Sequence, residues 1–304
     1  MIISLAILLD ALLGDPPNRF HPTAWMGNLI SFFTRDRPRE KPVLELIHGA
    51  AVIILGGGLF ASVGYLLQYL LNHLPMPFSW LGIALVLKST VSLHGLYRAS
   101  GEVQSALEKH DLTDARRLLS WHLVSRDTSQ LDESKIAAAA IESVAENASD
   151  GILAPLFFFV LGGLPAALAY RFINTADSML GYRDPAHEWL GKIPARLDDL
   201  LNILPARLTG LFIIVSTLFC NGNFTLARRI MRRDARQTAS PNAGVPMSAM
   251  AGALGVELEK VGHYRLGRGL RLPATADLAR ARRILICTVL LAVVSSFAIS
   301  ILYL

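Results

Sequence analysis

Two glutamates four residues apart, Glu142 and Glu146, are the residues of this sequence best suited to chemistry. They lie in SKIAAAAIESVAEN, a segment typical of a helix, so they share one helical face. Asp150 falls near the same stripe if the helix continues that far. Two like charges at this spacing cost roughly 0.2–0.5 kcal/mol unless a cation lies between them. The pattern predicts a magnesium or phosphate-chemistry site, and a solvated helix face remains the alternative.

Further acids, amides and arginines continue this polar stretch to residue 207, between segments apolar enough to enter a bilayer. An ionisable residue at membrane depth costs about 2.5–3.5 kcal/mol, so a membrane protein with only structural duties would keep such groups away. The candidates of this kind are Arg126, Asn147, Asn174, Asp177, Arg183, Arg196 and Arg207. Arg126 precedes the helix of the two glutamates, where backbone amides favour an anion such as phosphate. For any one arginine, an ion pair with a nearby aspartate explains the residue equally well.

A second polar element is the segment GDPPNRFHPTAWMGNLI near the beginning of the chain. Its three prolines exclude a regular helix, so His21 is expected on a stiff loop. His21 is a candidate general base. An interfacial turn anchored by Trp25 is the alternative interpretation.

These residues must be positioned by elements that are mostly membrane-embedded. The 304 residues are 52% hydrophobic and only 17% charged, and the apolar residues occur in runs. The expected membrane segments are 1–14, 46–71, 78–97, 152–170, 208–227 and 284–304. The Lys- and Arg-rich flanks place the intervening segments 15–45, 98–151 and 228–283 in the cytoplasm. The net charge of +5 therefore indicates membrane orientation, not nucleic-acid binding.

Glycines and prolines interrupt the segment 152–170, as in GGLP at 162–165. Non-helical backbone at membrane depth is tolerated where it lines a cavity enclosed by protein. We therefore expect re-entrant segments that bring the polar motifs together on the cytoplasmic side. The predicted fold is all-α: one polytopic membrane domain over 1–304, with about 4–6 membrane-embedded helices, broken or re-entrant segments among them, and cytoplasmic helical loops. Cys220 and Cys287 suggest neither a disulfide framework nor a metal cluster.

The segment SPNAGVPMSAMAGALGV, residues 240–256, combines turn residues with small residues. It predicts close backbone packing or a ligand loop, with Asn242 as a candidate binding residue.

Six motifs together resemble the CobD/CbiB family of adenosylcobinamide-phosphate synthases, which are integral membrane enzymes of cobalamin biosynthesis. The resemblance covers about residues 5–265. In chain order the motifs are LLDALLGDPPNRFHPTAWMG, LVSRDTSQL, IESVAENASDGILAP, YRFINTADSMLGYRD, ARLDDLLNILPARLTG and SPNAGVPMSAMAGALGV.

The resemblance implies ATP-dependent amide formation between a propionate carboxylate of adenosylcobyric acid and (R)-1-aminopropan-2-ol phosphate or free aminopropanol. It implies Mg²⁺ and ATP as cofactors, the corrinoid as substrate, and a multi-pass protein of the inner membrane whose active site faces the cytoplasm. Other enzymes of the corrinoid pathway are expected partners, besides the lipid bilayer.

The motifs are compatible with this chemistry, because a carboxylate must be activated, most simply as an acyl phosphate, before an amine attacks it. Magnesium prefers one or two carboxylates with phosphate oxygens and water, so Glu142, Glu146 and Asp150 are the expected ligands. Asp177, Asp198 or Asp199 is expected to form a second cluster. The arginines, with Asn147, Asn174 and Asn242, are candidates for phosphate or substrate contacts. No Walker motif G-x-x-x-x-G-K-[ST] occurs in the sequence.

Two alternatives belong to other functional classes. One is a membrane sensor or scaffold of the AmpE type, which shares parts of the sequence pattern. The other is a transporter, which the broken helices and embedded charges suit, although no inverted repeat is visible.

Overall fold

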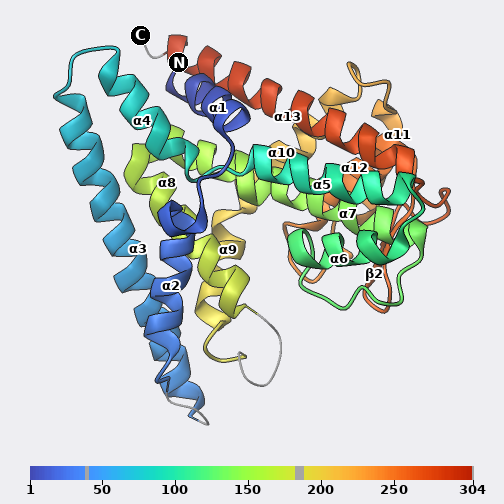
Figure 1. Cartoon of the computed structure of the whole chain (residues 1–304), viewed down its shortest axis with the longest axis horizontal. Coiled ribbons are helices and arrows are strands. Elements are labelled where there is room, and N and C mark those ends of the chain that lie inside the picture. Colours follow the sequence, from blue (N-terminus) through green and yellow to red (C-terminus); the bar gives the residue numbers. More distant parts are fainter. Residues whose placement is uncertain (38–40, 182–187, 303–304) are drawn as a thin grey trace. The chain divides into compact units, whose positions relative to one another are not determined.

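A computed structural model describes residues 1–37, 41–181 and 188–302 (Figure 1). Helices make up 74% of the structure, and the described strands form one short hairpin, so the all-α prediction is confirmed. The backbone contacts divide the chain into two compact units, each built from two separate stretches. The first comprises Met1–Ser92 and Ala154–Asn202, and the second comprises Leu93–Leu153 and Ile203–Leu304. The single domain expected from the sequence stays a prediction.

The first unit consists of helices. They are α1 (Ile2–Leu13), the short 3-10 helix η1 (Asn18–Phe20), α2 (Pro22–Thr34), α3 (Pro42–Asn72), α4 (Phe78–Lys88), α8 (Ala154–Leu180) and α9 (Lys192–Leu201). The second unit adds helices and the hairpin. Its elements are α5 (Leu93–Glu108), α6 (Leu112–His122), α7 (Glu133–Asn147), the π-helix η2 (Ala148–Leu153), α10 (Ile203–Ser216), α11 (Phe224–Asp234), α12 (Gly244–Leu254), β1 (Leu258–Lys260), β2 (Tyr264–Leu266) and α13 (Thr275–Leu302).

Close packing of α3 against α8 organises the first unit. Glycines on α3 make the approach possible, because a Cβ on Gly56 would lie 2.0 Å from the Phe172 ring. A Cβ on Gly64 would lie 2.8 Å from the backbone of Leu164 and Pro165. Small residues at such contacts let helix backbones approach closely inside membranes. Gly58, on the exposed side of α3, has nothing within 4 Å of its Cβ position.

The helix α8 breaks where the sequence places its paired glycines. Gly162 and Gly163 have non-helical backbone angles, and the positive φ of 66° at Gly163 favours glycine. The Gln68 Oε1 atom on α3 accepts a 2.7 Å hydrogen bond from the Leu164 amide, one of the donors that the break releases. The predicted interruption of this apolar segment is therefore confirmed.

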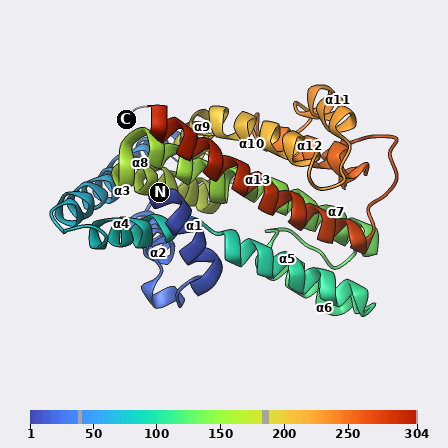
Figure 2. The same ribbon diagram turned by 90° about the horizontal axis from the view of Figure 1, so that it is seen from above.

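In the second unit, α7 lies at the centre and packs against α13, α12, α5 and β1. Figures 1 and 2 show α13 running beside α7. The run Ala137–Ala140 is 0–3% exposed, because alanine lets neighbouring helices approach α7 closely. Helix α12 is buried along its whole length, and a Cβ on Gly252 would lie 2.6 Å from the Ala227 backbone. The close backbone packing predicted for this segment is confirmed.

Side-chain contacts also tie distant parts of the second unit together. The Asp234 carboxylate at the end of α11 accepts hydrogen bonds from the Arg233 guanidinium at 2.7 Å and from the Gly267 amide at 2.7 Å. The two cysteines, Cys220 and Cys287, approach each other with their Sγ atoms 2.8 Å apart.

Among the described residues, three helical stretches are long and apolar enough to span a membrane, and up to five spans result if each bent pair of helices counts as one. The spans expected at 78–97 and 208–227 are not continuous helices. Helix α4 ends at Lys88 and α5 begins at Leu93, whereas α10 ends at Ser216, before a turn that leads to α11. The hydroxyls of Thr90 and Thr217 donate to carbonyls three residues earlier, at 2.7 and 2.6 Å, and such bonds compete with the helical pattern.

Candidate active site

The helix α7 carries both glutamates, as the sequence predicts. Asp132 caps it by accepting a 2.9 Å hydrogen bond from the Lys135 amide. Glu142 is only 5% exposed, whereas Glu146, one turn later, is partly exposed. The interpretation of this face as fully solvated is therefore wrong for Glu142. A carboxylate so buried requires a partner, because its charge is costly away from water.

That partner is Arg126, whose Nη2 atom lies 3.5 Å from the Glu142 Oε2 atom. The other carboxylate oxygen, Oε1, is buried and has no close hydrogen-bond partner, although the Tyr264 hydroxyl lies near enough to interact with the carboxylate. A buried carboxylate oxygen of this kind is the type of donor that Mg²⁺ prefers. The residues present therefore fit a magnesium ion, with Glu142 as the donor.

Tyr264, on β2, forms part of the same cluster. Burial raises the pKa of its phenol, and the negative charges of Glu142 and Glu146 raise it further, while Arg126 opposes them. The Tyr264 hydroxyl also contacts the Met247 sulfur of α12 at 3.8 Å. Tyr264 thus remains a neutral hydrogen-bond donor beside the acids. No sequence motif singles out Tyr264, because the hairpin lies far along the chain from the two glutamates.

The π-helix η2 follows α7 directly and carries Asp150. A π-helix winds more widely than an α-helix and recurs at functional sites. Asp150 was expected on the same helical face as Glu146 if the α-helix continued that far. The α-helix ends at Asn147, so Asp150 does not continue that face with α-helical spacing. Asn147 donates a 3.0 Å hydrogen bond to the Ser143 carbonyl, and Ser143 in turn donates to the Leu123 carbonyl at 2.9 Å.

The described residues contain no group of three or more His, Cys, Asp or Glu side chains placed to hold a metal ion. The expected ligands Glu142, Glu146 and Asp150 therefore do not form a three-acid cluster in this structure. An ion held by one or two of these acids would complete its shell with phosphate oxygens and water, the arrangement that magnesium commonly adopts.

Arg207 and Asn242 come together in the second unit. The Arg207 guanidinium donates to the Asn242 side-chain oxygen and, at 2.9 Å, to the Ile203 carbonyl. Asn242 is 3% exposed, so its hydrogen bond with Arg207 is buried within the second unit. The structure therefore connects two residues that the sequence analysis selected from different motifs.

In the first unit, a chain of hydrogen bonds joins α8 to α9. Asp198 accepts from Asn174 at 3.2 Å and from Asn202 at 2.9 Å, and Asn202 accepts from the Tyr170 hydroxyl at 2.8 Å. Arg171 donates to the Asn174 side-chain oxygen at 3.4 Å. The bonds from Asn174 and Asn202 to Asp198 hold α9 against α8, so Asn174 has a structural role in this structure. Tyr170 and Asn202 were not predicted as part of this cluster, because no sequence motif connects them to Asp198.

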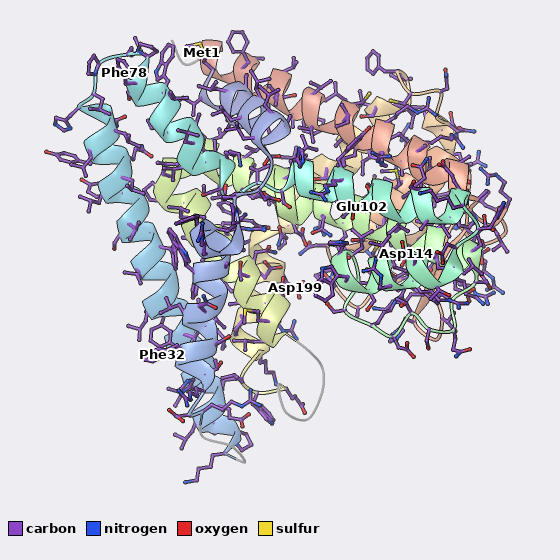
Figure 3. The ribbon with its side chains drawn as sticks, viewed as in Figure 1. Met1, Phe32, Phe78, Glu102, Asp114 and Asp199 are labelled. Atoms are coloured by element: carbon purple, nitrogen blue, oxygen red, sulfur yellow. The ribbon has the colours of Figure 1, made fainter. Side chains whose placement is uncertain are left out.

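The remaining candidates of the first unit lie in different settings. Asp177, on α8, packs closely against Gly181. A Cβ atom added to Gly181 would lie 2.1 Å from the Asp177 carboxylate. Arg196 is exposed on α9, where it precedes Asp198 and Asp199. Figure 3 labels Asp199 on this helix. Arg183 lies outside the described residues.

His21 caps the helix α2. Its Nδ1 atom accepts a 3.2 Å hydrogen bond from the Thr23 amide, and its Nε2 atom lies 3.5 Å from Asp15. A ring that accepts at Nδ1 carries its proton on Nε2. The loop predicted from the prolines is confirmed only as far as His21, and the expectation that Pro22 excludes a helix is wrong, because proline is tolerated in the first turn and α2 begins there. Both ring nitrogens of His21 are engaged at this boundary.

Comparison with known proteins decides the family. Residues 3–290 match the family described as CobD/Cbib protein. The chain belongs to the CobD/CbiB family. The match spans all six motifs as well as the cluster around Glu142 and Tyr264.

Members of the CobD/CbiB family from bacteria and archaea align over most of their length. A "Cobalamin biosynthesis protein CobD" of Dehalococcoides mccartyi is 45% identical over 277 residues, covering 90% of this chain and 89% of the relative. A "Probable cobalamin biosynthesis protein CobD" of Methanothermobacter thermautotrophicus is 42% identical, covering 88% and 86%. The Photorhabdus laumondii protein named "Cobalamin biosynthesis protein CobD" is 41% identical, covering 83% and 80%. No solved structure matches the chain.

Proposed function

We propose that this protein acts in cobalamin biosynthesis as an ATP-dependent, amide-forming ligase. The substrates would be a propionate carboxylate of adenosylcobyric acid and the amine of (R)-1-aminopropan-2-ol phosphate or aminopropanol. Membership of the CobD/CbiB family supports the pathway. The observation that carries the enzymatic role is the buried Glu142 carboxylate, with Arg126 on one oxygen and no close hydrogen-bond partner on the other.

Amide formation from a carboxylate needs two steps. The carboxylate first takes the terminal phosphoryl group of ATP, giving an acyl phosphate and ADP. The amine nitrogen then attacks the carbonyl carbon, phosphate leaves with the electrons of the broken C–O bond, and the nitrogen gives up one proton. A bound magnesium ion supplies charge neutralisation on the phosphate oxygens. Glu142 and Glu146 are the residues that would hold it.

The other members of the cluster have roles that follow from their positions. Arg126 is 26% exposed at its side chain, so part of its charge can face a phosphate or substrate carboxylate. The neutral Tyr264 phenol can donate a hydrogen bond to a charged oxygen beside the acids. Glu146, which is partly exposed, would reach a magnesium–nucleotide complex beside the buried Glu142.

The decisive test combines complementation with an assay on the purified protein. A cobalamin-requiring host that lacks the synthase should regain growth on cobyric acid, and Glu146→Gln should abolish the rescue while the variant stays in the membrane. The control Glu108→Gln removes an exposed acid of α5 that bonds only Gln104 in the described structure, so it should rescue fully. Purified protein should convert ATP to ADP in step with the amide product. Rescue by Glu146→Gln would remove this residue from the mechanism, and growth without product formation would favour a scaffold role.

We propose further that the protein is a multi-pass protein of the inner membrane with its polar loops in the cytoplasm. The Lys- and Arg-rich segments at 35–41 and 228–283 support this orientation. In a variant without the native cysteines, Glu188→Cys should react with an impermeant maleimide only from the cytoplasmic side. Labelling from outside would contradict the re-entrant arrangement.

A further inference from the structure

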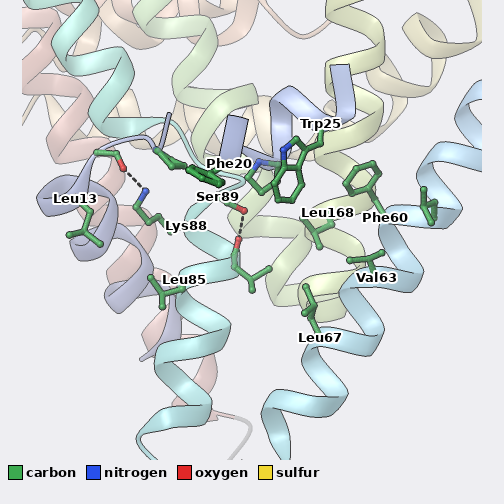
Figure 4. A pocket seen from close by; sticks show the side chains of 15 residues that line it. Leu13, Phe20, Trp25, Phe60, Val63, Leu67, Leu85, Lys88, Ser89 and Leu168 are labelled. Atoms are coloured by element: carbon green, nitrogen blue, oxygen red, sulfur yellow. Dashed lines mark hydrogen bonds between the residues drawn. The ribbon is translucent and has the colours of Figure 1, made fainter. Parts of the chain in front are cut away.

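An apolar pocket of about 760 Å³ is lined entirely by residues of the first unit. It is lined by α3, α4, α8 and the loop between α1 and α2 (Figure 4). Its volume is within the range of about 300–1,000 Å³ that is typical of small-molecule sites. Of the lining residues, Leu59, Val63 and Leu85 are 39–49% exposed, so the pocket opens to the outside of α3 and α4.

The pocket changes in character along its length. Figure 4 shows Phe20, Trp25, Lys88 and Ser89 gathered towards one end, and Val63, Leu67 and Leu85 towards the other. Aromatic and basic residues are enriched where a membrane meets water, whereas aliphatic side chains belong to the hydrocarbon region. This order matches that of an amphiphile, with its head at one end and its tail at the other.

The polar side chains that reach the pocket already have partners. The Lys88 ammonium donates to the Gly14 carbonyl at 2.5 Å and lies 3.9 Å from Asp10. The Ser89 hydroxyl donates to the Val86 carbonyl at 2.7 Å, and the Trp25 indole donates to the Arg19 carbonyl at 2.9 Å. A polar ligand would therefore leave its own hydrogen-bonding groups unpaired, which costs about 1–3 kcal/mol for each group. A nucleotide or corrinoid does not suit this lining.

The surface around the pocket is apolar and indicates that the ligand is a lipid chain. Helix α3 is long and apolar enough to span a membrane, and only 28% of its most apolar window is buried. Leu66 and Leu70, which do not line the pocket, are each 55% exposed on the same helix. Such a surface faces lipid chains when it lies in a bilayer, and the pocket is continuous with it.

We propose that this pocket binds one acyl chain of a membrane phospholipid. The chain lies between α3 and α4 beside Val63, Leu67 and Leu85, and the head group remains at the end marked by Trp25 and Lys88. Arg19, whose guanidinium lies 4.6 Å from the centre of the Phe20 ring, is exposed beside that end and meets the lipid phosphate. The site is independent of the ligase activity proposed above.

Trp25 provides the reporter for the test. The chain has four tryptophans, so changing Trp80, Trp121 and Trp189 to Phe leaves Trp25 as the only indole. Phosphatidylcholine with brominated acyl chains is titrated into this protein in detergent. Binding in the pocket predicts fluorescence quenching that saturates at one lipid per protein. Quenching that grows linearly with lipid, without saturation, would overturn the proposal.

Matched substitutions separate the pocket from the general lipid surface. Val63→Phe with Leu67→Phe narrows the aliphatic end of the pocket and should weaken the saturable binding at least about tenfold, equivalent to about 1.4 kcal/mol. Leu66→Phe with Leu70→Phe likewise introduces two phenylalanines into α3, but on its exposed face, and should leave the binding unchanged. Equal effects of both pairs would overturn the site.

Circular dichroism and size-exclusion chromatography check that the narrowed variant is folded. If it is not, Leu85→Phe narrows the pocket from α4 instead, and the same weakening is expected. Because the assay contains neither corrinoid nor ATP, its outcome does not depend on the proposed reaction.

Discussion

Removal of Arg126 should destabilise the protein far more than removal of Glu142. In Arg126→Gln the carboxylate of Glu142, 5% exposed, loses the partner that lies 3.5 Å from its Oε2 atom. Breaking a buried ion pair from one side costs about 3–5 kcal/mol, because the remaining charge is uncompensated. Arg126 is 26% exposed, so water screens part of the interaction, and we expect about 3 kcal/mol.

Glu142→Gln removes the buried charge together with its desolvation cost, and the remaining Arg126 can turn towards water. We expect a loss of about 1 kcal/mol, and nearly the same loss for the double variant. The coupling energy between the two residues is then about 3 kcal/mol in a double-mutant cycle. The measurement is the free energy of reversible unfolding in detergent micelles.

Arg117→Gln is the matched control. Arg117 lies only 2.6 Å from Asp114, but its side chain is 66% exposed, so this shorter pair should contribute about 0–1 kcal/mol. Figure 3 labels Asp114 on α6. The reasoning is refuted if Arg126→Gln costs no more than Arg117→Gln, because Glu142 would then behave as a solvated residue of a helix face.

Three further predictions concern the framework of the two units. Gly56→Val should destabilise the protein by about 1–3 kcal/mol in the same unfolding assay, since its side chain would overlap the ring packed on α3, whereas Gly58→Val has open space and should be tolerated. Mild oxidation with copper-phenanthroline should join the two cysteines, whose Sγ atoms are 2.8 Å apart, within one chain; two thiols that stay open to alkylation would contradict the contact. Asp234→Asn should lower the melting temperature at neutral pH and flatten its fall in acid. Burial raises the pKa of Asp234, but the hydrogen bonds from Arg233 and the Gly267 amide outweigh burial and hold the pKa below 3.8. Its contribution is therefore complete above about pH 4 and is lost as the pH falls through the lowered pKa, and equal acid sensitivity of both proteins would exclude this role.

The sequence predicted those parts of the fold and site that depend on local pattern. The glutamates lie on one helix because the helical repeat and the alanine run are local features. The break in α8 follows from its two glycines, which both leave helical geometry. Motif agreement identified the family, because several short segments had to match in order.

The parts that the sequence did not predict depend on contacts between distant segments. Tyr264 reaches the acids only because a hairpin packs beside α7, and no spacing rule connects the two. The end of α10 at Ser216 was not predicted, because the span at 208–227 was inferred only from the absence of charged residues. That criterion ignores hydroxyl groups that bond to the helix backbone, such as the Ser216 hydroxyl, which donates to the Phe212 carbonyl at 2.7 Å. The burial of Glu142 likewise depends on which neighbours cover α7.

The position of His21 leads to the last prediction, because it separates capping from base catalysis. His21→Asn should keep the cap of α2, since asparagine at this position accepts from the first backbone amides as the imidazole does, whereas His21→Ala should cost about 1 kcal/mol. A base must have a nitrogen lone pair available to the substrate, and the Nδ1 lone pair of His21 is used by the Thr23 amide. We therefore expect the asparagine variant to complement the synthase-deficient host and the alanine variant to be less stable in the unfolding assay. An asparagine variant of normal stability that fails to form the amide would instead establish His21 as the group that takes the proton, and the helix cap would be incidental to that role.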